Sequence, residues 1–215
     1  MDVIELGVQS FDENVLRLSK RGHSKQAVYE ACNLIKSYGF TLGIQLMIGL
    51  PGDSYSSCMN SVRETIAIAP QIARLYPTVV LPKTELCDMM DDGRYTPPGR
   101  EEMLNTVVDM YKALVSAGIN VIRIGLKSNE LIKGDTYHPA FGQLVQSRIA
   151  REKIEAQLDG LGELPKSVAI MAPPELINFA SGHKAENRKY FENKYPKVRF
   201  SFISSPFCDD YTVQI

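Results

Sequence analysis

The chain has 215 residues, 44% of them hydrophobic, and its 24 Lys and Arg are balanced by 25 Asp and Glu. This is enough chain for one large domain or one and a half, and the near-neutral charge gives no reason to expect a DNA-sized polyanion as partner. No apolar run approaches the ~20 residues that a membrane helix requires and no signal peptide opens the sequence, so we expect a soluble, cytoplasmic protein.

Strand and helix patterns alternate along the first 126 residues. The predicted strands span 3–9, 40–49, 75–81 and 120–126. The predicted helices span 11–21, 24–38, 54–68 and 100–117, and a long loop is expected between 81 and 99. The first helix is predicted to open with Ser10 and Glu13 spaced as in a capping box. This alternation predicts a parallel sheet built from βα units.

The first two strands differ between their two faces. The apolar face carries Ile4, Leu6, Val8, Phe40, Leu42, Ile44, Leu46 and Ile48. The opposite face carries small or polar residues for the most part, namely Val3, Glu5, Gly7, Gln9, Thr41, Gly43, Gln45, Met47 and Gly49. An open doubly wound sheet is apolar on both faces, whereas this asymmetry suits a barrel with helices outside and a polar lumen. A half-exposed strand is the alternative, and it fits less well because both strands lead directly into helices.

Several polar residues fall where such a barrel would bind a ligand. Gln9, Gln45 and Met47 lie at or near the carboxyl ends of their strands, which is the ligand-binding edge of βα barrels. The turn IGLPGD, residues 48–53, brings backbone close to the same edge, and it lacks the glycine spacing and terminal Lys-Ser/Thr of a phosphate loop.

Four cysteines stand at positions 32, 58, 87 and 208, and no two have the spacing of a local metal or cluster motif. Cys32 and Cys58 fall within predicted helices. We therefore interpret these thiols as small buried hydrophobes rather than ligands.

Four segments, in this order and spacing, resemble the radical SAM superfamily. They are GVQS (7–10), RGH (21–23), GLPGD (49–53) and YPTVVL (76–81). The resemblance covers about residues 3–150, and its nearest branch holds the elongator catalytic subunit and the oxygen-independent coproporphyrinogen III oxidases. It implies a six-stranded partial βα barrel with S-adenosylmethionine and a [4Fe-4S] cluster. Reductive cleavage of that cofactor would give a 5′-deoxyadenosyl radical that abstracts a hydrogen from the substrate.

The same resemblance implies cofactor-binding residues. Gln9, the glutamine of GVQS, would contact S-adenosylmethionine, and Gln45 occupies a strand position that is usually acidic or histidine in the family. Met47 and Val80 would lie against the adenine. Arg21 would meet a carboxylate bidentately, or else it is a solvated cation at the end of a helix.

Three further residues are candidates for the substrate side. Arg123 shares a strand face with Val121 and Gly125, so it would point into the lumen to meet substrate or to form a salt bridge with Glu5. His138 lies in a His-Pro-Ala-Phe-Gly run that resembles the tail of bacterial elongator-like proteins, and it would line the active site or simply pack.

One departure from the family is decisive for activity. The chain has no C-x-x-x-C-x-x-C cluster loop, and its first strand corresponds to the fourth strand of the family barrel. We therefore expect an α/β fragment, the second half of a (βα)6 partial TIM-type barrel, which retains part of a cofactor pocket but binds no cluster and is inactive alone. The bare edge of strand 3–9 is expected to make the fragment self-associate.

The composition changes at Leu161. Strands are predicted over 167–173, 198–203 and 211–215, with two helices between the first and second, so that residues 161–215 form a small βααββ unit after a first domain of residues 1–158. The run SGHKAENRKYF, 181–191, would contact an anion or RNA, or it is a solvated helix face.

Two functions of different class follow. The first is the cofactor and substrate side of a radical SAM oxidoreductase or transferase acting on a tRNA, a tetrapyrrole or another small substrate, with coproporphyrinogen III oxidation as the alternative chemistry. The second is a non-catalytic module that binds a partner or RNA through residues 161–215.

Overall fold

A computed structural model describes residues 2–126 and 132–215. The chain forms two compact units, Met1–Phe141 and Gly142–Ile215. The helix α6, Phe141–Asp159, buries Ile154 and Leu158 in the core of the second unit. The unit boundary falls at the first residue of this helix, whereas the predicted domain boundary at 158–161 lies at its other end.

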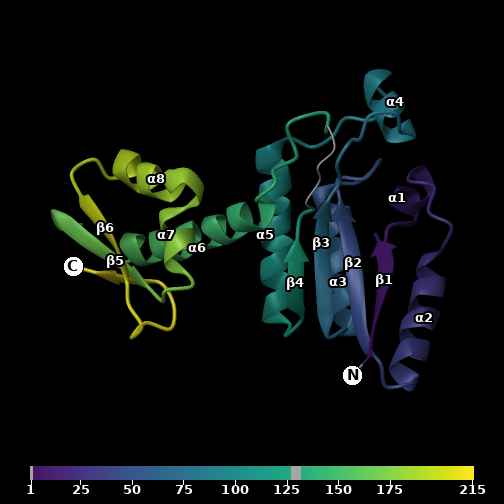
Figure 1. Cartoon of the computed structure of the whole chain (residues 1–215), viewed down its shortest axis with the longest axis horizontal. Helices are drawn as coiled ribbons and strands as arrows, with labels where there is room; N and C mark the ends of the chain where they lie inside the picture. The colour runs from purple at the N-terminus through teal and green to yellow at the C-terminus, as the bar shows by residue number, and fades with distance from the viewer. Residues whose placement is uncertain (1, 127–131) are drawn as a thin grey trace. The chain divides into compact units, whose positions relative to one another are not determined.

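The first unit is a four-stranded parallel sheet in the order β1-β2-β3-β4, so β1 and β4 are its edge strands. The strands are β1 Val3–Gln9, β2 Thr41–Ile48, β3 Ile72–Pro77 and β4 Asn120–Ile124. The helices are α1 Glu13–Leu18, α2 Lys25–Ser37, α3 Tyr55–Ile68, α4 Glu85–Asp91 and α5 Arg100–Ser116. Figure 1 shows the strands ending on the same side, near α4. The parallel α/β class expected from the sequence is confirmed.

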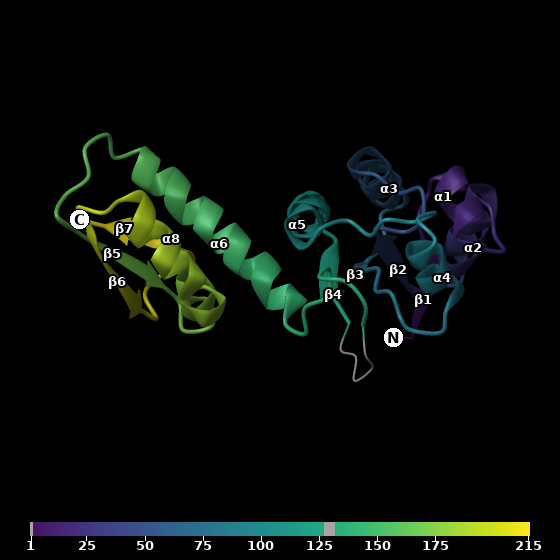
Figure 2. The same cartoon turned by 90° about the horizontal axis from the view of Figure 1, so that it is seen from above.

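The helices cover the apolar face of this sheet. Figure 2 shows α3 and α5 on one face, and both helices contact the strands beneath them. On β2, Leu42, Ile44 and Leu46 are almost completely buried on that face, whereas Gln45 and Met47 on the other face are half-buried. Because these three apolar side chains must all lie on the buried face, they fix the register of β2 and leave its polar side chains on the other face.

Three local predictions were wrong. The third strand, β3, begins at Ile72 rather than 75 and ends at Pro77, because its pairing with β2 runs from Gly43 to Ile48 and Pro77 has no N–H to continue the ladder. The expected loop 81–99 contains α4, capped by the Thr84 side chain. The first helix is capped by Asp12, whose carboxylate accepts hydrogen bonds from two backbone N–H groups of the first turn, and not by Ser10.

The second unit is a three-stranded sheet in the order β6-β5-β7, with β5 parallel to β6 and antiparallel to β7. Its elements after α6 are β5 Ser167–Ala172, α7 Ile177–Ser181, a 3-10 turn His183–Ala185, α8 Glu186–Lys194, β6 Arg199–Ser204 and β7 Thr212–Gln214. Its core is formed by apolar side chains from α6, α7, α8 and all three strands or their flanks. The βααββ order predicted for this region is the observed one.

Candidate functional site

The polar face of the first sheet brings together side chains from all four strands. We call it the polar sheet face, and it consists of Glu5, Gln9, Gln45, Met47, Arg74, Tyr76 and Arg123. The strand register sets Gln45 beside Arg74 and Met47 beside Tyr76. Five of these seven positions were predicted from the sequence, and Arg74 and Tyr76 were not. The alternation in the segment IARLYP, residues 72–77, was the signal that could have found them.

Gln9, the last residue of β1, and Gln45, in the carboxyl half of β2, form a hydrogen-bonded pair. The Gln45 Nε2 donates a hydrogen bond of 3.1 Å to the Gln9 Oε1. This pairing leaves one amide with its N–H₂ group and the other with its carbonyl oxygen for a ligand, so the pair can both donate and accept.

The backbone at Gln9 is held in an uncommon conformation. Its φ is +67°, in the left-handed region that residues other than glycine rarely adopt, and the β1–β2 register shifts between Leu6 and Gln9. A Cβ on Gly7 would lie only 2.7 Å from the Gln9 Nε2, so the absence of a side chain at position 7 makes room for the amide. Such strain, maintained at the carboxyl end of a strand, is typical of binding sites.

Arg21 lies beside Met47, two residues after Gln45 on β2. It follows α1 and its Nη2 donates to the Met47 Sδ at 3.4 Å, which places an exposed guanidinium next to the thioether of β2. The neighbouring His23 fixes the end of β1 through a 3.1 Å hydrogen bond between its Nε2 and the Val8 carbonyl. A cation is therefore placed at the rim of the polar sheet face.

The other end of the polar sheet face carries a charge network. Arg74 holds both carboxylate oxygens of Glu5, with its Nε at 2.6 Å and its Nη2 at 2.7 Å, and its Nη1 donates to the Tyr76 hydroxyl at 3.2 Å. Hydrogen bonds to Tyr76 and Glu5 raise the pKa of Arg74 further. The Arg123 guanidinium lies 5.9 Å from the centre of the Tyr76 ring. Glu5 is thus paired with Arg74 rather than with Arg123, and Arg123 remains a second cation on this face.

Two further predicted residues, Val80 and His138, make contacts of other kinds. Val80 is buried with Cys87 and Tyr95 in a separate small core and bridges to Lys133. The His138 Nδ1 accepts a 3.1 Å hydrogen bond from the Ala140 backbone N–H, just before α6 begins.

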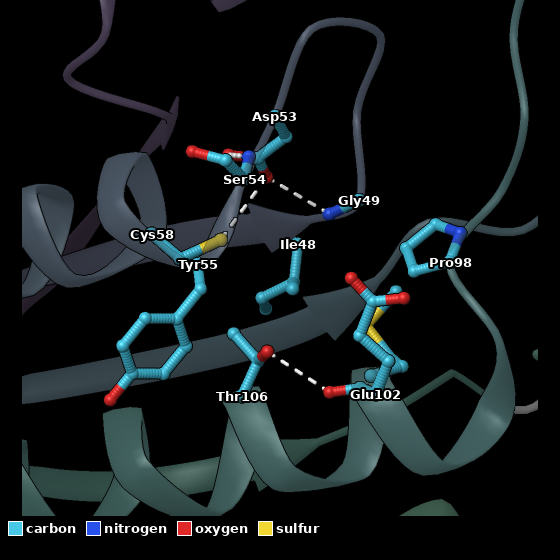
Figure 3. A pocket seen from close by; sticks show the side chains of 10 residues that line it. Ile48, Gly49, Asp53, Ser54, Tyr55, Cys58, Pro98, Glu102 and Thr106 are labelled. Carbon is cyan, nitrogen blue, oxygen red and sulfur yellow. Dashed lines mark hydrogen bonds between the residues drawn. The ribbon is translucent and has the colours of Figure 1, made fainter.

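The GLPGD turn is fixed from within rather than shaped to hold an anion. The Asp53 carboxylate accepts hydrogen bonds from the Gly49 N–H at 2.9 Å and the Ser54 N–H at 3.0 Å, and the Cys58 Sγ lies 3.2 Å from it. Burial and the nearby Asp53 carboxylate raise the pKa of the Cys58 thiol. Figure 3 shows this arrangement. The residues around it line a small pocket with a volume of about 30 Å³. Since Asp53 is fully engaged in holding the turn, we assign the pocket a structural role.

The described residues suit one of the two expected cofactors. Among residues 2–126 and 132–215, no group of three His, Cys, Asp or Glu side chains is placed to hold a metal ion. Cys32, Cys58 and Cys87 are separately buried, as the sequence predicted for the first two, so these residues do not fit a [4Fe-4S] cluster. The amide pair, the guanidinium and the thioether do fit the ribose, carboxylate and adenine of S-adenosylmethionine. Over the same described ranges, no helix is long and apolar enough to cross a membrane.

Known proteins with similar sequence or structure agree with this fold. The chain is 36% identical over 124 residues to the tRNA uridine(34) acetyltransferase of Dehalococcoides mccartyi, covering 56% of this chain and 27% of that protein. It is 27% identical over 115 residues to the heme chaperone HemW of Bacillus subtilis, covering 53% and 29%. The solved structure of the archaeal Methanocaldococcus infernus Elp3 with an N-terminal deletion superimposes with a TM-score of 0.64 and 27% identity, covering 71% of this chain and 36% of that one.

The chain spans roughly a quarter of the length of the curated relatives that it matches. Residues 1–64 match the Radical SAM superfamily, and residues 70–151 match the Radical_SAM C-terminal domain. Through these two segments, the chain belongs to the radical SAM superfamily.

Proposed function

We propose that the polar sheet face is the S-adenosylmethionine and substrate side of a radical SAM enzyme that modifies tRNA. The observation that supports this best is the Gln9–Gln45 amide pair at the carboxyl ends of two adjacent parallel strands, where barrels of this kind bind ligands. Enzymes of the superfamily use S-adenosylmethionine and a [4Fe-4S] cluster.

Each residue has a separate task in this proposal. Gln9 and Gln45 hydrogen-bond to the ribose or the methionyl group, and Met47 lies against the adenine. Arg21, at the rim, pairs with the methionyl carboxylate. Arg123 is the substrate-side cation, since Arg74 already neutralises Glu5. The contacts of Val80 and His138 favour supporting roles for both.

The bound cofactor supplies a hydrogen-abstracting 5′-deoxyadenosyl group when a cluster donates an electron. Because the described residues do not fit a cluster, we infer that the thiolates come from a polypeptide segment other than these, and that this chain is inactive without it. What the chain itself does is to bind, orient and shield the nucleoside part of the cofactor.

The choice of tRNA as substrate is supported by the relatives. One is named a tRNA uridine(34) acetyltransferase, and the structure with the TM-score of 0.64 is an Elp3. A tetrapyrrole substrate, as in coproporphyrinogen III oxidation, is the second candidate, and the heme chaperone among the relatives favours it.

The test is the binding of radiolabelled S-adenosylmethionine to the 215-residue chain in equilibrium dialysis. Gln9→Asn is the sharpest variant, because asparagine tolerates the left-handed backbone while its shorter side chain cannot reach Gln45. We expect Gln9→Asn and Gln45→Ala each to weaken binding about fivefold, the effect of one net hydrogen bond. Gln26→Ala, on the surface of α2, is the matched control and should bind as the wild type does.

The complete gene product, reconstituted anaerobically with iron and sulfide, provides the second readout. With S-adenosylmethionine and dithionite it should release 5′-deoxyadenosine, and Gln9→Asn should release much less. Normal binding and normal 5′-deoxyadenosine release by both glutamine variants would contradict the proposed site.

A further inference from the structure

The second unit has an arrangement of its own that the proposed function does not use. Strand β5 is followed by the two helices α7 and α8 and then by β6, which pairs with β5 in parallel. Both helices contact β6, and Ala180 of α7 and Phe191 of α8 are completely buried in the same core. The result is a strand–helix–helix–strand module whose two helices pack on one face of a sheet (Figure 1).

The loop between the two helices is short and its conformation is specific. It reads Gly182-His183-Lys184-Ala185, and Gly182, Lys184 and Ala185 have φ angles of +80°, +50° and +60°. A Cβ at Gly182 would lie 2.7 Å from the Asn187 backbone nitrogen, so no larger residue fits there. Only glycine at this position lets the chain turn this tightly from α7 into α8.

Asn187 follows the loop and holds it in place through hydrogen bonds to two other segments. It is buried, and its Nδ2 donates to the Phe179 carbonyl at 3.0 Å and to the Ser147 carbonyl of α6 at 2.7 Å. Its Oδ1 has no hydrogen-bond partner among the described residues, and its Cγ lies 3.0 Å from the position of a Cβ on Gly182. The loop is thus held rigidly, next to a buried acceptor that the described protein atoms do not satisfy.

The surface around the loop is basic. Lys184 in the loop and Lys189 on α8 are exposed, and Glu186 is the carboxylate beside them. The Arg188 guanidinium of α8 lies 4.7 Å from the centre of the Phe202 ring of the edge strand β6, so α8 and β6 together present a cation stacked on an aromatic ring. Cationic side chains attract the phosphate groups of a nucleic acid. Unpaired bases stack on flat guanidinium groups and aromatic rings.

We propose that the Gly182–Ala185 loop binds the sugar–phosphate backbone of a single-stranded nucleic acid, with a base against Arg188 and Phe202. A four-residue, glycine-initiated loop between two helices is the element with which KH modules clamp a nucleotide backbone. The fourth position of that loop is alanine here, and its φ of +60° keeps the left-handed conformation that glycine would favour. This site is separate from the S-adenosylmethionine site, and its test does not depend on that proposal.

The test is fluorescence anisotropy of the 215-residue chain with labelled oligouridine, oligothymidine and duplex RNA. We expect both single strands to bind more tightly than the duplex, and the comparison of the two distinguishes an RNA site from a DNA site. Lys184→Asp should weaken single-strand binding about tenfold and lower the slope of log K against log salt by about 1 or more.

Lys197→Asp is the matched control, since it makes the same charge change at another exposed lysine of the same unit, before β6. It should change binding less than about twofold, because distant surface charges are screened by salt. Equal losses in the two variants, or tighter binding of the duplex than of either single strand, would overturn the proposal. Thermal unfolding of each variant by circular dichroism confirms that it is folded.

Discussion

The Arg74 side chain of β3 reaches over β2 to hold the Glu5 carboxylate of β1, through contacts of 2.6 and 2.7 Å. The residue crossed is Gly43, which pairs with Glu5 in the strand register. A Cβ at position 43 would lie 2.7 Å from the Glu5 Cγ and 3.0 Å from the Ile72 Cγ1. The bare backbone of Gly43 is therefore what allows an ion pair between strands that are not neighbours.

Gly43→Ala should destabilise the first unit by about 1–3 kcal/mol, because the new methyl group overpacks a site with no free space and displaces Glu5. Urea unfolding measures the change. Gly22→Ala is the control, since a Cβ there meets no atom within 4 Å. If both variants unfold at the same urea concentration, the close approach at Gly43 has no energetic importance.

The acid stability of the chain should depend on Glu64. Hydrogen bonds from Lys25 and Tyr29 lower the pKa of Glu64 below its ordinary value of 4.5. A carboxylate whose pKa is lowered by folding stabilises the fold above its unfolded pKa, and this contribution is lost as the pH falls through the folded pKa.

The free energy of unfolding of the wild type should therefore exceed that of Glu64→Gln by a constant amount, below about 1 kcal/mol for this half-buried pair, between pH 5 and pH 8. The difference should shrink below pH 4.5. Glu30→Gln, on the exposed side of α2, is the control for the loss of a surface carboxylate from the same unit. A difference that stays constant down to pH 3 would contradict this assignment.

Tyr95 should stabilise the GLPGD turn through one buried hydrogen bond. Its hydroxyl donates to the Gly49 carbonyl at 2.6 Å. Tyr95→Phe leaves that carbonyl without its partner and should cost about 1–2 kcal/mol. Tyr55→Phe is the control, because it removes a hydroxyl that donates to Asp109 at an exposed site. It should change the stability much less than Tyr95→Phe.

Burial raises the pKa of Tyr95 to about 12, so the neutral hydroxyl is favoured in the folded chain. The contribution of Tyr95 is then present below its unfolded pKa of 10.0 and lost as the pH rises toward 12. Urea denaturation of the wild type and of Tyr95→Phe at several alkaline pH values measures this loss. The free energies of unfolding of the two proteins should converge as the pH rises through that range.

The thiols should differ sharply in reactivity. Cys32, Cys58 and Cys87 are buried, and burial raises the pKa of the first two, so little thiolate is available there. Cys208 is half-exposed. Ellman's reagent should label Cys208 first and the other three only after denaturant is added, and Cys208→Ser should abolish the fast phase. Rapid labelling of Cys58 in the native chain would show that its helix opens readily.

The open edge of β1 gives a further expectation. It ends the sheet, and Val3 on it is 51% exposed. We predict that the chain forms dimers or larger assemblies through this edge, because unpaired strand edges attract other strands. Sedimentation velocity should show a concentration-dependent coefficient, which Val3→Lys should abolish. A wild-type chain that sediments as a monomer at all concentrations contradicts the prediction.

The sequence by itself determined the elements whose side chains alternate strongly or whose ends carry caps. The strands β1 and β2 and the helices α2 and α3 follow from such patterns. In the structure, the side chains of Ser24 and Ser54 cap the two helices. It also determined that Gln45 and Met47 share a face opposite to Leu46, because the two-residue period of a strand is local.

Only the tertiary structure decided which polar residues meet. The partner of Glu5 is Arg74, 69 residues away, and this depends on the register of β1, β2 and β3 together and on the small residue between them. The left-handed backbone of Gln9 likewise appears in no local pattern, because glutamine gives no preference for it. Register and strain are fixed by packing across the sheet, so a pattern read along one strand carries no information about them.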